Sequence, residues 1–145
     1  MIKLAISGYI GAGKTQLSER AATTGWGLTR LSVAQFIKAE LTDLLECAGV
    51  GEYDEAAKPF YRELLFNWGL FRRSQQYSYW VDRLVEAIKA QAEGKEPAVG
   101  FVIDSVRCRN EVDALRAMGF RHVRLHIDLQ RRYAYLRHIS GMDED

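Results

Sequence analysis

The sequence has 145 residues, of which 48% are apolar and 27% are charged, and its formal net charge is +1. A chain of this size should bury roughly two-thirds of its unfolded surface in one domain, so intrinsic disorder is excluded. No apolar run approaches the roughly 20 residues that span a bilayer, and the first residues do not resemble a signal peptide. Two cysteines, Cys47 and Cys108, show no metal-ligand spacing, so we expect neither a disulfide scaffold nor a zinc site, and a cytoplasmic location.

Arginine outnumbers lysine by 14 to 6. Arginine grips phosphate through two parallel hydrogen bonds, whereas lysine acts as a point charge. The bias fits a protein that binds phosphate groups, and a solvated surface that favours arginine explains it equally well. The balanced net charge disfavours binding of duplex DNA through bulk charge, so nucleic acid is not a favoured partner.

The first residues of the chain predict a strand, a helix and a second strand. Residues 2–7 are mainly apolar and end at Gly8, which is typical of a buried strand. A helix is expected over residues 15–24, because Gly25 stands where helices end in a left-handed cap. A short second strand is expected over residues 28–31.

The middle of the chain is predicted to be helical. Ser32 is expected to cap a helix whose apolar residues recur at helical spacing, namely Val33, Ile37, Leu41, Leu44 and Ala48. A loop marked by Gly49, Gly51 and nearby acidic residues follows. The next helix should stop near Gly69, and its apolar face comprises Tyr61, Leu64, Leu65 and Trp68. A further helix ends before Gly94 and carries Val81, Leu84, Val85, Ile88 and Ala92.

The last third of the chain predicts strands that alternate with helices. Residues 99–103 are apolar throughout, as in strands inside a parallel sheet. Residues 110–118 predict a helix capped by Gly119, and residues 123–127 alternate as in a strand with one wetter face. A basic helix from residue 130 to about 139 and an acidic tail follow. This alternation predicts a single α/β domain with a parallel sheet.

The strongest motif lies between the first strand and the first helix. Residues 8–15 read GYIGAGKT and match the phosphate-loop pattern G-x-x-x-x-G-K-[ST]. Its glycines let backbone N–H groups approach phosphate oxygens at a helix start, where the helix dipole favours an anion. Lys14 would reach the β- and γ-phosphates, and the Thr15 hydroxyl would ligate Mg²⁺. We therefore expect ATP to bind to Gly8, Tyr9, Ile10, Gly11, Ala12, Gly13, Lys14 and Thr15.

A carboxylate follows the apolar strand at residues 99–103. Asp104 is placed to hold a water of the Mg²⁺ shell or to orient an attacking hydroxyl, so Thr15 and Asp104 are the expected metal residues. The alternative is an aspartate that caps the helix before Asn110. Arg107 is expected to point over the same sheet edge and to grip a substrate phosphate.

Further sequence blocks resemble those of a known family in their order. They are the phosphate loop, SVAQFIK at 32–38, KPFYRELL at 58–65 with WG at 68–69, YWV at 79–81, and DSVR at 104–107 with NE at 110–111. Over about residues 2–139 the chain resembles the bacteriophage-type deoxynucleoside monophosphate kinases, which are similar to dephospho-CoA kinases and adenylate kinases in the P-loop kinase group. The resemblance implies a three-layer α/β/α fold. It also implies transfer of the ATP γ-phosphate, with Mg²⁺, to a deoxynucleoside monophosphate.

The resemblance further implies residue roles. Residues 33–94 would bind the acceptor through Ala34, Phe36, Lys38, Arg62, Trp80, Arg107 and either Arg72 or Arg73. For Arg62 an exposed helix position is the alternative, and for Trp80 a core position. Residues 128–145 would form a partial lid, whose Arg131, Arg132 and Arg137 would join Lys14, Asp104 and Arg107 as catalytic residues. An amphipathic basic helix is the alternative for this segment.

The sequence departs from the family pattern in three places. Ser105 stands where the family often has aspartate, Arg72 and Arg73 lack the expected spacing after Gly69, and only residues 128–145 follow the last strand. If the chain is complete, a second subunit would have to supply a missing strand, so a homodimer is worth testing. The competing functions are a related kinase that acts on dephospho-CoA or on a hydroxymethylated base in phage DNA, and a nucleotide-binding module without catalysis.

Overall fold

The structure is a computed structural model that describes residues 1–51 and 58–140, with side chains described for 1–51 and 60–138. The acidic residues expected in the loop after Gly51 and the acidic tail lie outside the described residues. The chain divides into two compact units. One comprises Met1–Arg30 with Pro97–Asp145, and the other comprises Leu31–Glu96.

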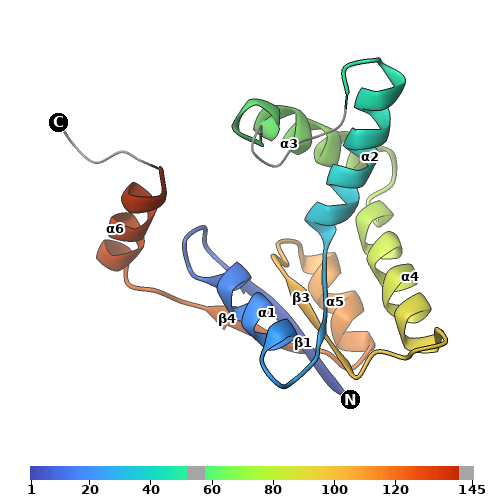
Figure 1. Cartoon of the computed structure of the whole chain (residues 1–145), viewed down its shortest axis with the longest axis vertical. Helices are drawn as coiled ribbons and strands as arrows, with labels where there is room; N and C mark the ends of the chain where they lie inside the picture. The colour runs from blue at the N-terminus through green and yellow to red at the C-terminus, as the bar shows by residue number, and fades with distance from the viewer. Residues whose placement is uncertain (52–57, 141–145) are drawn as a thin grey trace. The chain divides into compact units, whose positions relative to one another are not determined.

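Parallel strands form the centre of the first unit (Figure 1). Strand β1 (Ile2–Gly8) pairs in parallel with β3 (Gly100–Asp104) on one side and with β4 (Arg121–Leu125) on the other. Strand β2 (Thr29–Ser32) completes the order β2-β3-β1-β4. Parallel pairing brings the carboxyl ends of β1, β3 and β4 to one edge, so Gly8 and Asp104 end their strands at that edge.

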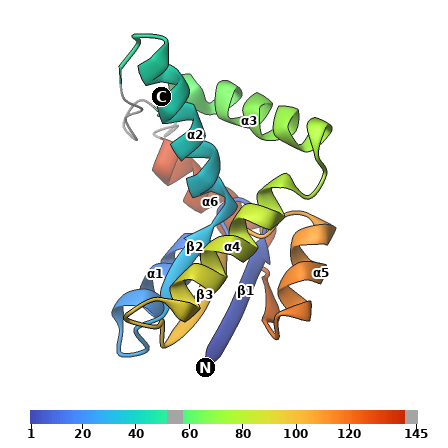
Figure 2. The same ribbon diagram turned by 90° about the vertical axis from the view of Figure 1, so that its right-hand side faces the viewer.

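Helices cover both faces of this sheet. Helix α1 (Lys14–Thr23) and helix α5 (Arg109–Ala117) lie on opposite sides of β1 and β3 (Figure 2). All five residues of β3 are therefore buried, which explains the uninterrupted apolar sequence of residues 100–103 before Asp104. Strand β4 is more open, and Val123 is 40% exposed. The predicted α/β architecture with a parallel sheet between helical layers is confirmed.

Three helices form most of the second unit, namely α2 (Val33–Cys47), α3 (Lys58–Gln75) and α4 (Tyr79–Glu93). Each of them packs against the other two. Helix α2 begins as predicted after Ser32, whose backbone N–H donates to Gln35 Oε1 at 3.1 Å. The buried face of α4 comprises Trp80 and the predicted Val81, Leu84 and Ile88.

The prediction that a helix stops near Gly69 is wrong, because α3 continues to Gln75. Gly69 is buried, and a Cβ at this position would lie 3.2 Å from Ile37 Cδ1 of α2. The indole Nε1 of Trp80 donates to the Gly69 carbonyl at 3.0 Å. The missing side chain therefore allows two neighbouring helices to approach α3 closely.

The buried faces of α2 and α3 also differ from the predicted stripes. In α2, Leu45 is buried and Leu44 is 42% exposed, although Leu44 was the expected core residue. In α3, Leu64 is 44% exposed. Two adjacent leucines can both fit the spacing of an apolar helix face, so helical spacing alone does not predict which of them is buried.

The remaining predicted ends are found close to the expected positions. Gly25 and Gly119 follow α1 and α5 with φ values of 61° and 82°, the left-handed conformation expected there. The basic helix predicted after the last strand is α6 (Leu129–Ser140). Within residues 1–51 and 58–140, no helix is both long and apolar enough to cross a membrane.

Candidate functional site

The phosphate loop connects β1 to α1 at the carboxyl edge of the sheet. Gly8, Gly11 and Gly13 adopt φ values of 151°, 77° and 81°, which are open to glycine and strained for other residues. A Cβ at Gly8 would lie 2.7 Å from the Leu125 carbonyl oxygen, so β4 closes the space beside the loop. Gly13 caps α1, and Lys14 is the first residue of that helix.

Lys14 lies across the loop, where its Nζ donates to the Tyr9 carbonyl at 2.8 Å. Partial burial and the positive charge of Arg107 lower the pKa of Lys14 below its usual value, against a smaller opposing effect of Asp104. Like charges at close range favour the binding of an anion that neutralises them. The loop therefore has the backbone shape and the charge to hold a phosphate group.

Asp104 is 3% exposed at the end of β3. Its Oδ2 accepts hydrogen bonds from Ser18 Oγ at 3.1 Å and from Arg30 Nε and Nη2 at 2.8 and 2.5 Å. Asp104 therefore does not act as the helix cap considered as its alternative role, and Glu111 makes that contact instead. The hydrogen bonds of Asp104 with other described residues all use Oδ2, which leaves Oδ1 for a water or metal ligand.

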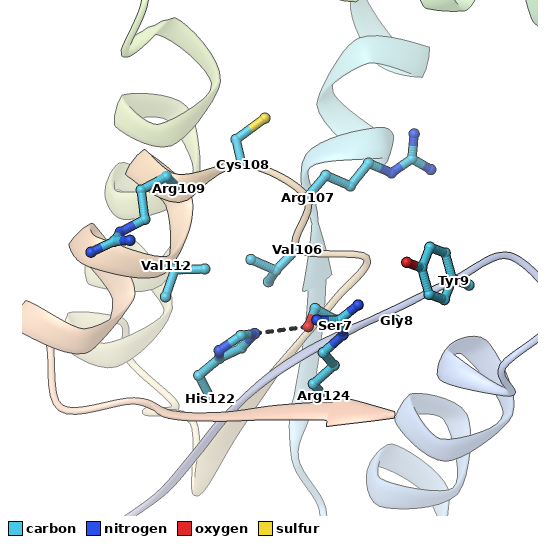
Figure 3. A pocket seen from close by; sticks show the side chains of 10 residues that line it. All are labelled: Ser7, Gly8, Tyr9, Val106, Arg107, Cys108, Arg109, Val112, His122 and Arg124. Atoms are coloured by element: carbon cyan, nitrogen blue, oxygen red, sulfur yellow. Dashed lines mark hydrogen bonds between the residues drawn. The ribbon is translucent and has the colours of Figure 1, made fainter. Parts of the chain in front are cut away.

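The turn after β3 carries Arg107. Ser105 has a left-handed φ of 58°, and the backbone N–H of Val106 donates to a carbonyl of β1 at 3.0 Å. The buried Glu111 carboxylate accepts the backbone N–H groups of Arg107 and Cys108 at 2.7 and 3.1 Å. The backbone around Arg107 is thereby held, and its exposed side chain extends to the same side as Tyr9 (Figure 3).

A cavity of about 390 Å³ lies between β1, β4 and the start of α5 (Figure 3). Arg107, Arg109 and Arg124 line it, and none of its ten lining residues carries a carboxylate. His122 Nε2 lies 2.9 Å from Ser7 Oγ, and both residues line the cavity. Arg109 is paired with Asp113 at 3.1 Å and is largely exposed.

Helix α6 contacts the phosphate loop through two side chains. A Cβ at Gly11 would lie 3.1 Å from Leu136 Cγ and 3.2 Å from Arg132 Cγ. The Arg132 guanidinium lies 5.0 Å from the centre of the Tyr9 ring. Of the three expected lid arginines, Arg132 therefore lies against the loop. Arg131 and Arg137 are exposed on the same helix.

Most of the residues expected to bind the acceptor lie in the second unit, where Glu40 joins the helices. Glu40 Oε2 accepts from Trp68 Nε1 and Arg72 Nε at 3.0 and 2.9 Å, and Oε1 accepts from the Tyr79 hydroxyl and from Arg83. Partial burial would raise the pKa of Glu40, yet the hydrogen bonds from Tyr79, Trp68 and Arg72 lower it below its usual value. Glu40 is therefore a charged centre of the helical packing.

The residues expected to bind the acceptor differ in their contacts and in their burial. Arg72 pairs with Glu40 and stacks 4.9 Å from the rings of both Trp68 and Tyr79, so it belongs to the internal network. Trp80 is 1% exposed, which fits its alternative role in the core. Arg62 is exposed, and Ala34, Phe36, Lys38 and Arg73 are half-buried, as is Arg72.

Sequence reasoning missed Arg30, Ser18 and Glu40. Arg30 meets Asp104 across 74 positions of sequence, and Trp68 meets Glu40 across 28. A faint signal existed for Arg30, since it stands in a short strand between the buried Leu28 and Leu31. Ser18 is likewise fully buried on a helix that is otherwise mostly polar.

Comparisons with known proteins concern the fold. No family model matches the sequence, and no curated protein matches it significantly. Among solved structures, the chain is similar to a gluconokinase from Sinorhizobium meliloti 1021, with a TM-score of 0.51 and 18% sequence identity over 97% of this chain. This chain spans 66% of the gluconokinase chain, just under two thirds of its length. The chain thus shares the fold of this gluconokinase.

Proposed function

We propose that the protein is a phosphotransferase that moves the γ-phosphate of ATP to a deoxynucleoside monophosphate. The observation that carries the proposal is the phosphate loop itself, where Gly11 and Gly13 have left-handed φ values and Lys14 begins α1 within the influence of the positive charge of Arg107. The P-loop kinase fold supports phosphate transfer in general. The order of the sequence blocks supports the nucleotide acceptor.

The residues of the loop have separate tasks in this proposal. The N–H groups of residues 8–15 would bind the phosphates of ATP, and Lys14 would bridge the β- and γ-phosphates. Mg²⁺, when bound, would neutralise charge on these phosphates, and Thr15 and Asp104 offer it oxygen ligands. Both oxygens suit this ion, which usually takes one or two protein oxygens beside those of phosphate and water.

During transfer, an oxygen of the acceptor attacks the γ-phosphorus, and the bond to the bridging oxygen of ADP breaks. Arg107 and Arg132 would neutralise charge on the phosphoryl group as it moves between the two phosphates. The acceptor itself would bind to the second unit through Ala34, Phe36, Lys38, Arg62 and Arg73. Arg72 would act on it through the packing around Glu40.

A second candidate differs in the acceptor. One similar solved structure is a gluconokinase, so a small hydroxy acid is one alternative to a nucleotide. Dephospho-CoA and hydroxymethylated DNA are the other acceptors that a related kinase would use. A nucleotide-binding module without catalysis is the remaining alternative.

The decisive experiment is a screen of acceptors with coupled detection of ADP. The panel contains the common ribonucleoside and deoxyribonucleoside monophosphates, dephospho-CoA, gluconate and hydroxymethylated DNA, each with Mg·ATP. ATP turnover that appears with a deoxynucleoside monophosphate supports the proposal. Turnover with another acceptor alone would select the second candidate, and tight ATP binding without turnover would select the binding module.

Two variants make the screen specific for the loop. Lys14→Ala should abolish transfer and leave the fold intact, because Lys14 contacts a backbone carbonyl at the surface of the loop. Arg109→Ala is the matched control, since Arg109 pairs with Asp113 in solvent. Activity that survives Lys14→Ala would refute the assigned ATP site.

A further inference from the structure

Tyr9 occupies a position of the phosphate loop that the motif leaves open to any residue. Tyr9 is 56% exposed, and two guanidinium groups from different secondary-structure elements lie close to its ring. Arg124 of β4 lies 5.5 Å from the ring centre, and Arg132 of α6 lies 5.0 Å from it. Both distances fall within the range of a cation–π interaction, which is about 6 Å.

Arg132 is also held from a second side. Its Cγ, together with Leu136, fills the space where a side chain on Gly11 would lie. The stem of Arg132 therefore packs on the loop backbone while its guanidinium stacks near Tyr9. Contacts at both ends of a flexible side chain reduce the number of positions that it can adopt.

One donor of Arg132 has no use in this arrangement. Its Nε is buried and lacks a hydrogen-bond partner within the described part of the chain. A buried donor without a partner is costly and is uncommon in folded proteins. Its position beside a loop that favours phosphate indicates that an anionic oxygen completes this hydrogen bond.

We infer that Tyr9 is a positioning residue whose ring seats Arg124 and Arg132 beside the phosphate loop, so that Arg132 donates to a phosphate oxygen of the bound triphosphate. The inference rests on the proposed function for the identity of that triphosphate. It assigns Tyr9 no contact with the reacting atoms. Tyr9 acts through the two arginines.

The test compares two substitutions of Tyr9. Tyr9→Phe keeps the aromatic ring, and Tyr9→Leu removes it at similar size. Trp26→Leu is the matched control, because Trp26 is an equally exposed aromatic residue at the opposite end of α1 from the loop. The 145-residue chain is used throughout, and none of these three substitutions removes a buried side chain.

Two quantities are measured for each variant. The first is the rate of amide hydrogen exchange over residues 129–138 without ligand, which reports how firmly α6 contacts the loop. The second is the affinity for Mg·ATP and for inorganic tripolyphosphate. Tyr9→Leu should raise the exchange rate and weaken both ligands by about fivefold, as expected for one cation–π contact. Tyr9→Phe and Trp26→Leu should stay within about twofold of the unsubstituted protein.

A double substitution separates positioning from a general effect on the loop. Because Tyr9 acts through Arg132, Arg132→Ala should weaken tripolyphosphate binding less in the Tyr9→Leu background than in the unsubstituted protein. Unchanged exchange and affinity in Tyr9→Leu, or equal losses in Tyr9→Phe and Tyr9→Leu, would overturn the inference.

These outcomes are distinct from failure of the proposed function. A chain that transfers no phosphate to any acceptor would refute the kinase proposal, and the exchange rates and the tripolyphosphate affinities would still report on Tyr9. If the protein transfers phosphate to a nucleotide, and removal of the Tyr9 ring changes neither the exchange rates nor the affinities, the kinase proposal stands and the role of Tyr9 is refuted.

Discussion

Arg30 donates two hydrogen bonds to a single oxygen of Asp104, at 2.8 Å from Nε and 2.5 Å from Nη2. Ser18 adds a third donor to the same oxygen. The carboxylate at the end of the central strand is thereby held in one orientation, with its charge compensated from one side. The pair of Arg30 and Asp104 therefore stabilises the first unit and orients a side chain of the proposed metal site.

Arg30→Leu should destabilise the protein by about 2 kcal/mol, because the buried carboxylate of Asp104 would lose two of its three donors. Urea unfolding measures this change. Glu19→Gln is the control, since Glu19 contacts Arg30 at 3.5 Å in solvent, and it should cost less than about 0.5 kcal/mol. Equal losses for the two variants would mean that the contact between Arg30 and Asp104 contributes little.

The pKa of Lys14 predicts how nucleotide binding depends on pH. Because burial and the charge of Arg107 lower this pKa, Lys14 should lose its proton, and the protein its affinity for ATP, at a lower pH than a lysine with the usual pKa of 10.5. Arg107→Ala removes one cause of the lowering, so the alkaline midpoint should move to higher pH. Amine-specific labelling of Lys14 against pH measures the midpoint in the free protein.

Arg109→Ala provides the comparison for this experiment. Arg109 neighbours Arg107 in sequence, but its guanidinium is paired with Asp113 in solvent. Its removal should leave the labelling midpoint of Lys14 in place. A midpoint that moves equally in both variants would show a general effect of net charge.

Glu40 should make stability depend on acid pH. Its folded-state pKa lies below the usual 4.5, so its contribution is complete above pH 4.5 and is lost as the pH falls through the lower, folded-state value. Glu40→Gln should cost about 1–2 kcal/mol at neutral pH and remove this part of the acid dependence. Unfolding curves between neutral and acid pH measure both effects.

The exposed Glu46 on the same helix offers a control for Glu40. Glu46→Gln removes an equal charge without breaking the contacts with Trp68, Arg72 and Tyr79. It should leave the acid dependence of stability almost unchanged. If both variants flatten the curve equally, the network around Glu40 is not its source.

Gly11→Ala should weaken ATP binding and loosen α6. Alanine would be strained at the φ of 77°, and its Cβ would approach Leu136 and Arg132 to within 3.2 Å. Gly27→Ala introduces similar strain at φ 56°, with nothing within 4 Å. Both variants should lose about 1 kcal/mol of stability. Only Gly11→Ala should raise amide exchange in α6 and reduce nucleotide affinity.

The sequence by itself determined the strands of the central sheet and the phosphate loop, because both depend on residues that are close together in sequence. The mainly apolar segments before Gly8 and Asp104 predict buried parallel strands, and the spacing of Gly13, Lys14 and Thr15 predicts an anion site between strand and helix. Helix ends at Ser32, Gly25 and Gly119 follow from local backbone preferences. These features need no knowledge of distant residues.

Only the tertiary structure decided which side chains complete these sites. The partners of Asp104 and Glu40 come from segments far apart in sequence. The residues next to a charged side chain in sequence do not indicate which distant residue will pair with it. Gly69 looks like a helix end in sequence, and packing of Ile37 and Trp80 makes it a helix interior. Local patterns set where the chain turns and what it buries, whereas contacts across the fold depend on how whole elements pack.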